Sequence, residues 1–109
     1  MKKFKKRTYD NLNHFWSDFI FLINNITKIK DAMSGALISP VFRERLMIVV
    51  TAVNECRYCS YYHSKIALTK GLDRGEIHNL LKGSVNDCPD NEINAILYAQ
   101  HWAEKDTKP

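Results

Sequence analysis

The chain has few of the residues that break helices: its 109 residues include only four glycines and three prolines. It also has few runs in which β-branched apolar residues alternate with polar ones, the pattern that predicts half-buried strands. Because helix interiors tolerate Gly and Pro least, both shortages favour helices over strands. We therefore expect an all-α protein, a helical bundle of about five helices.

Long apolar runs are absent as well. No run approaches the roughly 20 residues that a membrane-spanning helix needs. Residues 11–26, which follow the basic N-terminus, are interrupted by Asn13, His14, Asp18 and Asn24, and no small-residue cleavage site follows them. A secretory signal would need an uninterrupted apolar segment and such a site. We therefore expect no export and no membrane partner, and place the protein in the cytoplasm.

Positive charge is scarce outside the N-terminus. The net charge is +4, and the first seven residues alone carry Lys2, Lys3, Lys5, Lys6 and Arg7. No basic stripe is interleaved with aromatic residues, so we expect no nucleic-acid partner. The basic segment is either a solvated terminus or a weak contact with an anionic surface.

Helix signals divide the chain into five predicted helices. Apolar residues at steps of three and four predict one long helix over residues 8 to about 30, with Gly35 after its end. Ser39 and Pro40 are typical of a helix start, and residues 41 to about 53 are apolar nearly all round, so this helix should be central. Asn54 suits a break. The remaining helices are predicted over residues 56–70, where the third helix begins, 73–81 and 91–104.

No internal repeat or low-complexity linker divides these segments. We therefore expect one domain over residues 1–109, with the N-terminal helix in 1–38 and the core in 39–104. The N-terminal helix is unusually rich in large apolar side chains, which suit a core or subunit interface better than a ligand surface. These residues are Phe15, Trp16, Phe19, Phe21, Leu22 and Ile23. They offer more apolar surface than a small domain can hide, so we expect a homo-oligomer.

Two of the three cysteines form a Cys-x-x-Cys pair, Cys56 and Cys59, and His63 follows four residues later. On one helix the three side chains would fall within an arc of roughly 60°. A thiolate is the reactive form of cysteine, and a nearby base or cation favours it. In a reducing compartment such a pair is more often catalytic or metal-binding than a structural disulfide. The pattern therefore predicts thiol–disulfide chemistry.

Metal binding and inert core thiols are the alternatives for this pair. A structural zinc site needs four ligands, and Cys56, Cys59 and His63 supply three. Glu44 or Cys88 would have to be the fourth, and the spacing matches no common zinc module. We expect no metal and no bound cofactor. Cys88 is expected to behave as a small apolar residue or a loop thiol.

Glu44 stands between two arginines at the start of the most apolar run. It is either a surface charge paired with an arginine or a partly buried carboxylate that orients His63 or relays its proton. In one straight helix the Cα atoms of Glu44 and Cys56 would lie about 18 Å apart. A break near Asn54 would fold Glu44 back towards the thiols. It would also place Cys56 in a first helical turn, where the macrodipole stabilises a thiolate.

The spacing Glu44-x11-Cys56-x2-Cys59-x3-His63 resembles the signature of the alkylhydroperoxidase D-like, carboxymuconolactone decarboxylase family. Further matching residues are Arg43 before Glu44, Asn54 and Tyr58 around the cysteines, Ala67, Gly71 and Leu72. The resemblance covers residues 39–103. It implies an all-helical bundle of that type, usually assembled as trimers or hexamers. It also implies that Glu44 and His63 form a proton relay to the thiols.

Members of this family with a Cys-x-x-Cys pair include peroxidases, whereas the decarboxylase branch lacks the pair. The resemblance and the pattern together predict a peroxidase-type thiol–disulfide oxidoreductase with the catalytic residues Glu44, Cys56, Cys59 and His63. One thiolate attacks a hydroperoxide, the other thiol condenses with the sulfenic acid to a disulfide, and an external dithiol reductant protein resets the pair. The alternatives are a non-enzymatic redox sensor or partner-binding subunit, and a decarboxylase or lactone enzyme of the same family.

The order of attack within the pair depends on which neighbour matters more. His63 lies one turn beyond Cys59, which favours Cys59 as the attacking thiol and Cys56 as the resolving thiol. The position of Cys56 at a helix start favours the reverse order.

Overall fold

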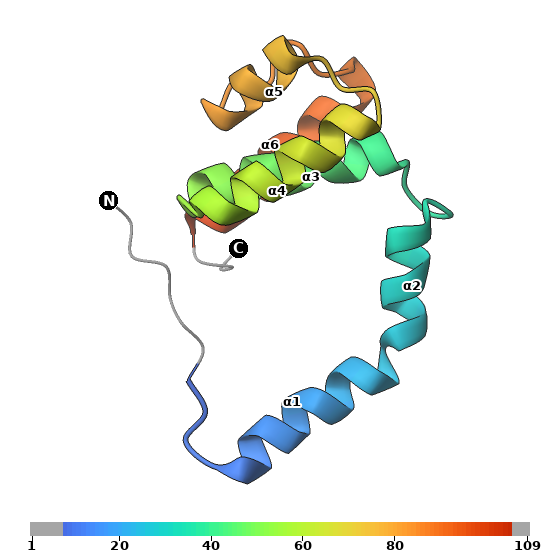
Figure 1. Cartoon of the computed structure of the whole chain (residues 1–109), viewed down its shortest axis with the longest axis vertical. Helices are drawn as coiled ribbons and strands as arrows, with labels where there is room; N and C mark the ends of the chain where they lie inside the picture. The colour runs from blue at the N-terminus through green and yellow to red at the C-terminus, as the bar shows by residue number, and fades with distance from the viewer. Residues whose placement is uncertain (1–7, 106–109) are drawn as a thin grey trace. The chain divides into compact units, whose positions relative to one another are not determined.

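The computed structural model describes residues 8–105, and this range forms six α-helices and no strands (Figure 1). The helices are α1 (Leu12–Asn24), α2 (Ile26–Ser34), α3 (Pro40–Val53), α4 (Arg57–Thr69), α5 (Arg74–Leu81) and α6 (Asp90–Glu104). The predicted all-α fold is therefore confirmed. No helix of the described range is long and apolar enough to cross a membrane. The basic residues from Lys2 to Arg7 lie outside the described residues.

The contacts divide the chain into two compact units. One unit ends at Ser39 and contains α1 and α2, and the other begins at Pro40 and contains α3 to α6. This boundary lies next to the predicted division between residues 38 and 39. The expectation of a single domain stays a prediction.

The prediction of one N-terminal helix over residues 8–30 is wrong. Asn25 separates α1 from α2, and its side-chain Nδ2 donates to the Phe21 carbonyl at 2.8 Å. Asparagine has this effect because its side chain competes for backbone hydrogen bonds. The helix that follows the cysteines is therefore the fourth, α4, rather than the third.

The N-terminal end of this segment also differs from the prediction, whereas Gly35 marks its C-terminal end as predicted. Helix α1 begins at Leu12 because the side chain of Asn11 accepts a hydrogen bond from the His14 N–H at 2.8 Å, as an N-cap does. Helix α2 continues to Ser34 and ends at Gly35, whose φ of 83° lies in the left-handed region that favours glycine.

Neither α1 nor α2 contains a buried residue. The aromatic residues of α1 contact one another: Phe15 and Phe19 stack, and Trp16 meets Phe19 edge-on. Many large apolar side chains of this unit are exposed, including Leu12, Phe15, Trp16, Phe19, Ile20, Phe21, Leu22, Ile23, Ile26 and Met33. The structure therefore does not place the aromatic residues of α1 in a core of the described chain, and their role in a subunit interface stays a prediction.

The second unit is built around α3, which packs against α4, α5 and α6. Pro40 begins α3 as predicted, and Ile48 and Val49 are fully buried. The core contains residues from all four helices and from the connections between them: Ile48, Val49, Ala67, Leu72, Ile77, Leu80, Cys88 and Ile96. Met47, however, is exposed, so α3 is central without being buried on every side.

A partly buried ionic cluster fixes α3 to the two helices that follow α4. Arg45 Nε donates to Glu76 of α5 at 2.6 Å, and its Nη1 donates to Glu92 of α6 at 2.8 Å. Burial works to lower the pKa of Arg45, but the hydrogen bonds and charges of the two carboxylates outweigh it and raise this pKa above its ordinary value. These two charged hydrogen bonds fix the rotation of α3 about its own axis relative to α5 and α6.

The remaining helix boundaries agree with the sequence prediction. Gly71 follows α4 with a φ of 99°, and the Asp73 side chain caps α5 by accepting from the Gly75 N–H at 2.9 Å. Pro89 precedes α6. Cys88, just before it, is buried and forms no disulfide, and burial, followed by the nearby charge of Glu76, raises the pKa of its thiol.

Candidate functional site

The predicted break between α3 and α4 is present, and it reverses the chain within three residues. Helix α3 ends at Val53 and α4 begins at Arg57. Between them Glu55 has a φ of 53°, a left-handed conformation that non-glycine residues rarely adopt. The Cys56 N–H then donates to the Thr51 carbonyl at 3.1 Å, which closes the turn against the end of α3. Because of this reversal α4 packs back along α3.

The Cys-x-x-Cys pair lies at the start of α4. Cys56 is the N-cap residue and forms a disulfide with Cys59, with the two Cα atoms 5.3 Å apart. The Cys59 N–H also donates to the Cys56 sulfur at 3.3 Å. The first N–H groups of a helix have no partner within the helix, so this sulfur occupies the place that a capping oxygen usually takes.

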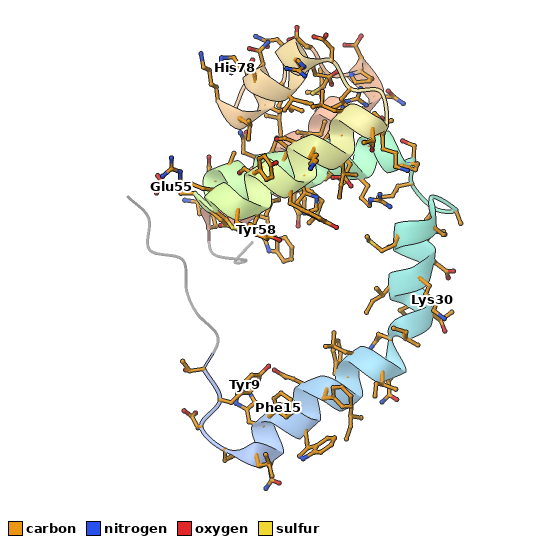
Figure 2. The ribbon with its side chains drawn as sticks, in the orientation of Figure 1. Tyr9, Phe15, Lys30, Glu55, Tyr58 and His78 are labelled. Carbon is orange, nitrogen blue, oxygen red and sulfur yellow. A yellow bond between two sulfur atoms is a disulfide. The ribbon has the colours of Figure 1, made fainter. Side chains whose placement is uncertain are left out.

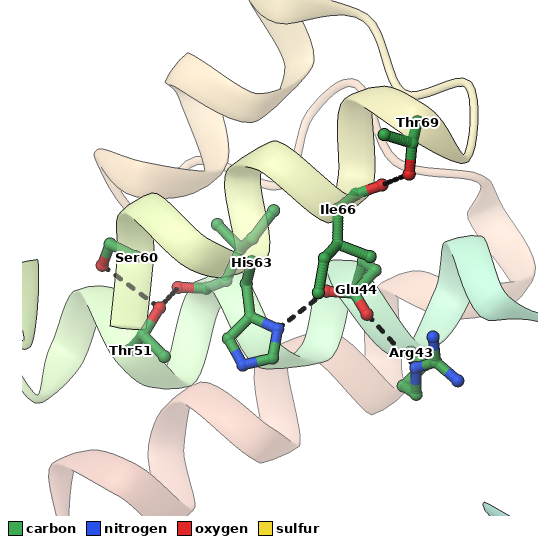
Figure 3. A network of polar contacts seen from close by, with 8 residues as sticks. Arg43, Glu44, Thr51, Ser60, His63, Ile66 and Thr69 are labelled. Carbon is green, nitrogen blue, oxygen red and sulfur yellow. Dashed lines mark hydrogen bonds and ion pairs between the residues drawn. The ribbon is translucent and has the colours of Figure 1, made fainter. Parts of the chain in front are cut away.

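Glu44 is the most buried charged residue of the described chain, with 1 % of its surface exposed. Its Oε2 lies 2.8 Å from Nδ1 of His63 on α4, and its Oε1 accepts from Arg43 Nε at 3.2 Å (Figure 3). Each of the two alternatives for Glu44 is therefore correct in part. It pairs with an arginine, but it does so in the interior while it contacts His63. The arrangement matches the expectation of a carboxylate that orients the histidine.

This contact determines which nitrogen of His63 is available for chemistry. A carboxylate accepts hydrogen bonds and cannot donate them, so with Glu44 ionised Nδ1 carries the proton and Nε2 is left as the acceptor. The His63 side chain is largely buried, and the Tyr62 ring packs edge-on against it. His63 follows Cys59 by four residues on α4, about 6 Å along the helix axis. The structure thus places the His63 imidazole one helical turn after Cys59, in contact with the Glu44 carboxylate.

A pair of hydroxyl groups, which the sequence analysis did not identify, also connects α3 with the start of α4. Ser60 Oγ donates to Thr51 Oγ1 at 3.2 Å, and Thr51 Oγ1 donates to the Ile48 carbonyl at 2.9 Å (Figure 3). Ser60 directly follows Cys59, so this connection holds the second cysteine's turn against α3. The signal in the sequence was Thr51 itself, a polar residue within an otherwise apolar helix.

A pocket lies next to the turn that holds the disulfide. This pocket of about 570 Å³ is lined by Ala52, Glu55, Arg57, Ser60 and Leu81. Glu55 and Arg57 are the neighbours of Cys56 in the chain, so the pocket borders the turn that holds the disulfide. Tyr58, between the two cysteines, is 78 % exposed (Figure 2).

Within residues 8–105 no group of three or more His, Cys, Asp or Glu side chains is placed to hold a metal ion. Cys88, the candidate for a fourth ligand, is buried in the core cluster that excludes Cys56 and Cys59. The expected absence of a metal and of a cofactor stays a prediction.

Comparison with protein families places these observations in context. The model of the carboxymuconolactone decarboxylase family matches residues 27–105. The chain belongs to this family. The resemblance inferred from the spacing of Glu44, Cys56, Cys59 and His63 is therefore confirmed. No curated protein and no solved structure matches the chain.

The match to the carboxymuconolactone decarboxylase family contains all four candidate site residues. The match begins within α2 and spans α3 to α6, so the disulfide and the Glu44–His63 contact both lie inside it. The family includes alkylhydroperoxidase-like members.

Proposed function

We propose that the protein is a thiol–disulfide oxidoreductase that reduces hydroperoxides, with Cys56 and Cys59 as its redox pair and Glu44 and His63 as its proton relay. The observation that carries this proposal is the combination of a disulfide at the start of α4 with a buried Glu44–His63 contact one turn further on. Membership of a family with alkylhydroperoxidase-like members supports it.

The proposed oxidation consumes one hydroperoxide for each disulfide formed. The Cys59 thiol gives its proton to Nε2 of His63, and the thiolate attacks the hydroperoxide oxygen. The O–O bond breaks, Cys59 becomes a sulfenic acid, and the leaving alkoxide takes a proton from His63 to become an alcohol. The Cys56 thiol then attacks the sulfenic sulfur, the S–S bond forms and water leaves. Glu44 keeps the imidazole in the tautomer that can accept and return the proton.

The reduction uses two electrons and two protons from an external dithiol. The Cys59 N–H that points at the Cys56 sulfur stabilises negative charge there, and a better-stabilised thiolate leaves a disulfide faster. The reductant's thiolate therefore attacks Cys59, and Cys56 departs. This assignment reconciles the two sequence arguments, because Cys59 is the peroxide-attacking thiol and Cys56 is the leaving thiolate. No resident cofactor takes part in either half of the cycle.

The working form is proposed to be a homo-oligomer, a trimer or hexamer, located in the cytoplasm. The support is the apolar surface of α1, which contains no buried residue. Burial of apolar surface contributes about 25 cal/mol for each Å² removed from water, and contiguous exposed apolar patches commonly mark interfaces. A second copy of the chain would cover the α1 side chains that this chain leaves exposed.

Peroxide consumption with a panel of dithiol donors tests the proposed activity. Wild-type protein should consume an alkyl hydroperoxide only when a dithiol is supplied, and Cys59→Ser should lose this activity entirely. Cys88→Ala is the matched control, since it removes a cysteine outside the disulfide and should keep the activity. After mild oxidation, mass spectrometry should show the loss of two protons in wild type and none in Cys56→Ser or Cys59→Ser.

The same measurements separate the alternatives. A redox sensor would form the disulfide once and show no turnover with any donor. A decarboxylase or lactone enzyme would keep its activity when both Cys56 and Cys59 are replaced. Either result would exclude the peroxidase assignment.

A further inference from the structure

The two arginines on either side of Glu44 have different partners. Side chains two positions apart in a helix point about 200° away from each other. Arg45 accordingly contacts Glu76 and Glu92 on α5 and α6. Arg43 contacts the Glu44 carboxylate instead. One arginine of α3 thus connects helices, and the other faces the candidate site.

Arg43 and His63 divide the two oxygens of Glu44 between them. Arg43 Nε donates to Oε1 at 3.2 Å, and His63 Nδ1 lies 2.8 Å from Oε2 (Figure 3). A buried carboxylate needs hydrogen bonds and opposite charge to remain ionised. Only 2 % of the Glu44 side chain is exposed, so water supplies little of this compensation. Arg43 provides the positive charge that persists when His63 is neutral.

The contact between Arg43 and Glu44 is unusual for two adjacent residues of a helix. Adjacent residues of a helix do not face each other, so the Arg43 side chain must bend along α3 to reach its neighbour. The Arg43 side chain is itself only 14 % exposed, so a long cationic group lies largely out of water beside this carboxylate.

We propose that Arg43 is a positioning residue of the site. Its guanidinium holds Oε1 of Glu44, so that Oε2 faces Nδ1 of His63 and the imidazole stays in the tautomer with Nε2 free. The consequence for the reaction rests on the proposed function, but the effect on the tautomer does not. If Arg43 acts through its charge, lysine should replace it in part, whereas glutamine, which is uncharged, should not.

The ring-nitrogen NMR signals of His63 provide the decisive measurement. Oxidised protein with ¹⁵N-labelled histidine is examined at one mildly alkaline pH, without any peroxide, and the His63 signals are assigned by their loss in His63→Gln. Wild type should show the Nδ1–H tautomer. Arg43→Gln should show a mixture of both tautomers, and Arg43→Lys should return most of the wild-type pattern. An unchanged tautomer in Arg43→Gln would overturn the proposal.

Arg45→Gln is the matched control, because it removes the same charge two residues away on the same helix. Arg45 ties α3 to α5 and α6, so this variant should lower the melting temperature and leave the His63 tautomer unchanged. Arg43→Gln leaves a buried carboxylate without its positive partner and should lower the melting temperature too, so the tautomer, which only Arg43→Gln should change, separates the two variants. If Arg45→Gln disturbed the tautomer as much as Arg43→Gln, the effect would be a general loss of structure, and a positioning role for Arg43 would be refuted.

A kinetic measurement connects the tautomer with the proposed reaction. In a single turnover with an alkyl hydroperoxide, Arg43→Gln should form the disulfide about tenfold more slowly, at the lower end of what the loss of an orienting partner costs, and Arg43→Lys should recover most of the rate. If wild type shows no peroxide reaction but Arg43→Gln still changes the tautomer, the proposed function fails and the positioning role stands. If wild type reacts and neither the tautomer nor the rate of Arg43→Gln changes, the positioning role fails alone.

Discussion

Helices α1 and α2 and helices α3 to α6 both carry many large apolar side chains, but they differ in what covers them. In the second unit Ile48, Leu80 and Ile96 are fully buried, and α3 contacts each of the other three helices. In the first unit neither helix has a buried residue. Apolar periodicity therefore predicts that a helix has an apolar face, and it does not predict which molecule covers that face.

The candidate site residues all lie in the second unit. Glu44 comes from the central helix of the second unit, and the disulfide and His63 come from α4, which packs against it. A buried carboxylate is tolerated there because the surrounding helices fix its partners in place. The first unit leaves its apolar side chains exposed instead, so the candidate site and the proposed association surface lie in different parts of the chain.

The largest expected contrast is in stability. Ile48→Ala removes a fully buried side chain from the core and should lower the free energy of unfolding by about 2–5 kcal/mol. Phe19→Ala, on exposed α1, should change it by no more than about 0.5 kcal/mol at low protein concentration. Urea denaturation of the two variants measures the difference. Equal losses at every protein concentration would show that α1 is buried within one chain, and the comparison would no longer hold.

Removal of the proposed base should slow the chemistry without preventing it. His63→Ala should reduce the rate of disulfide formation about a hundredfold, as expected when a general base is lost, and Glu44→Gln should have a smaller effect of the same sign. His14→Ala is the control from the other unit, since this partly buried histidine of α1 lies outside the candidate site and should leave the rate unchanged. Stopped-flow oxidation monitored by thiol loss gives the rates. A His63→Ala rate equal to wild type would remove His63 from the mechanism.

Association should depend on α1. Phe19→Glu introduces a charge among the exposed aromatic residues of this helix and should shift the solution mass, measured by light scattering, towards the monomer. Tyr98→Glu, at an exposed aromatic position of α6, serves as the control and should keep the wild-type mass. Wild-type protein that stays monomeric at high micromolar concentration would contradict the proposed assembly.

The smallest effect concerns alkaline pH. Burial raises the pKa of the Cys88 thiol, so the folded protein retains this proton after the unfolded chain has lost it. The protonated Cys88 thiol contributes fully to the free energy of unfolding below the ordinary pKa of a thiol. This contribution declines as the pH rises towards the raised pKa of the folded protein. Cys88→Ala should therefore lose less stability than wild type between these two pH values. Denaturation curves at neutral and alkaline pH measure this difference. Equal losses of stability in wild type and Cys88→Ala would contradict the prediction.

Helix boundaries in the second unit were predictable because the signals are local. Pro40 begins α3, Asp73 caps α5 and Gly71 follows α4 as their conformational preferences require. Asn25 is the same kind of signal, and its effect was overlooked because the apolar repeat continues across it. A residue that competes for backbone hydrogen bonds can divide a helix even where the apolar pattern does not change.

The sequence by itself determined the helical class, the turn at Asn54 and the pairing of two cysteines at a helix start, because each depends on residues within a few positions of one another. Only the tertiary structure decided that Glu44 is buried, that it meets His63 nineteen positions away, and that Arg43 rather than Arg45 contacts it. These facts depend on how far the turn reverses the chain and on how α3 is rotated against its neighbours. No local pattern encodes that rotation, since it results from the packing of four helices at once.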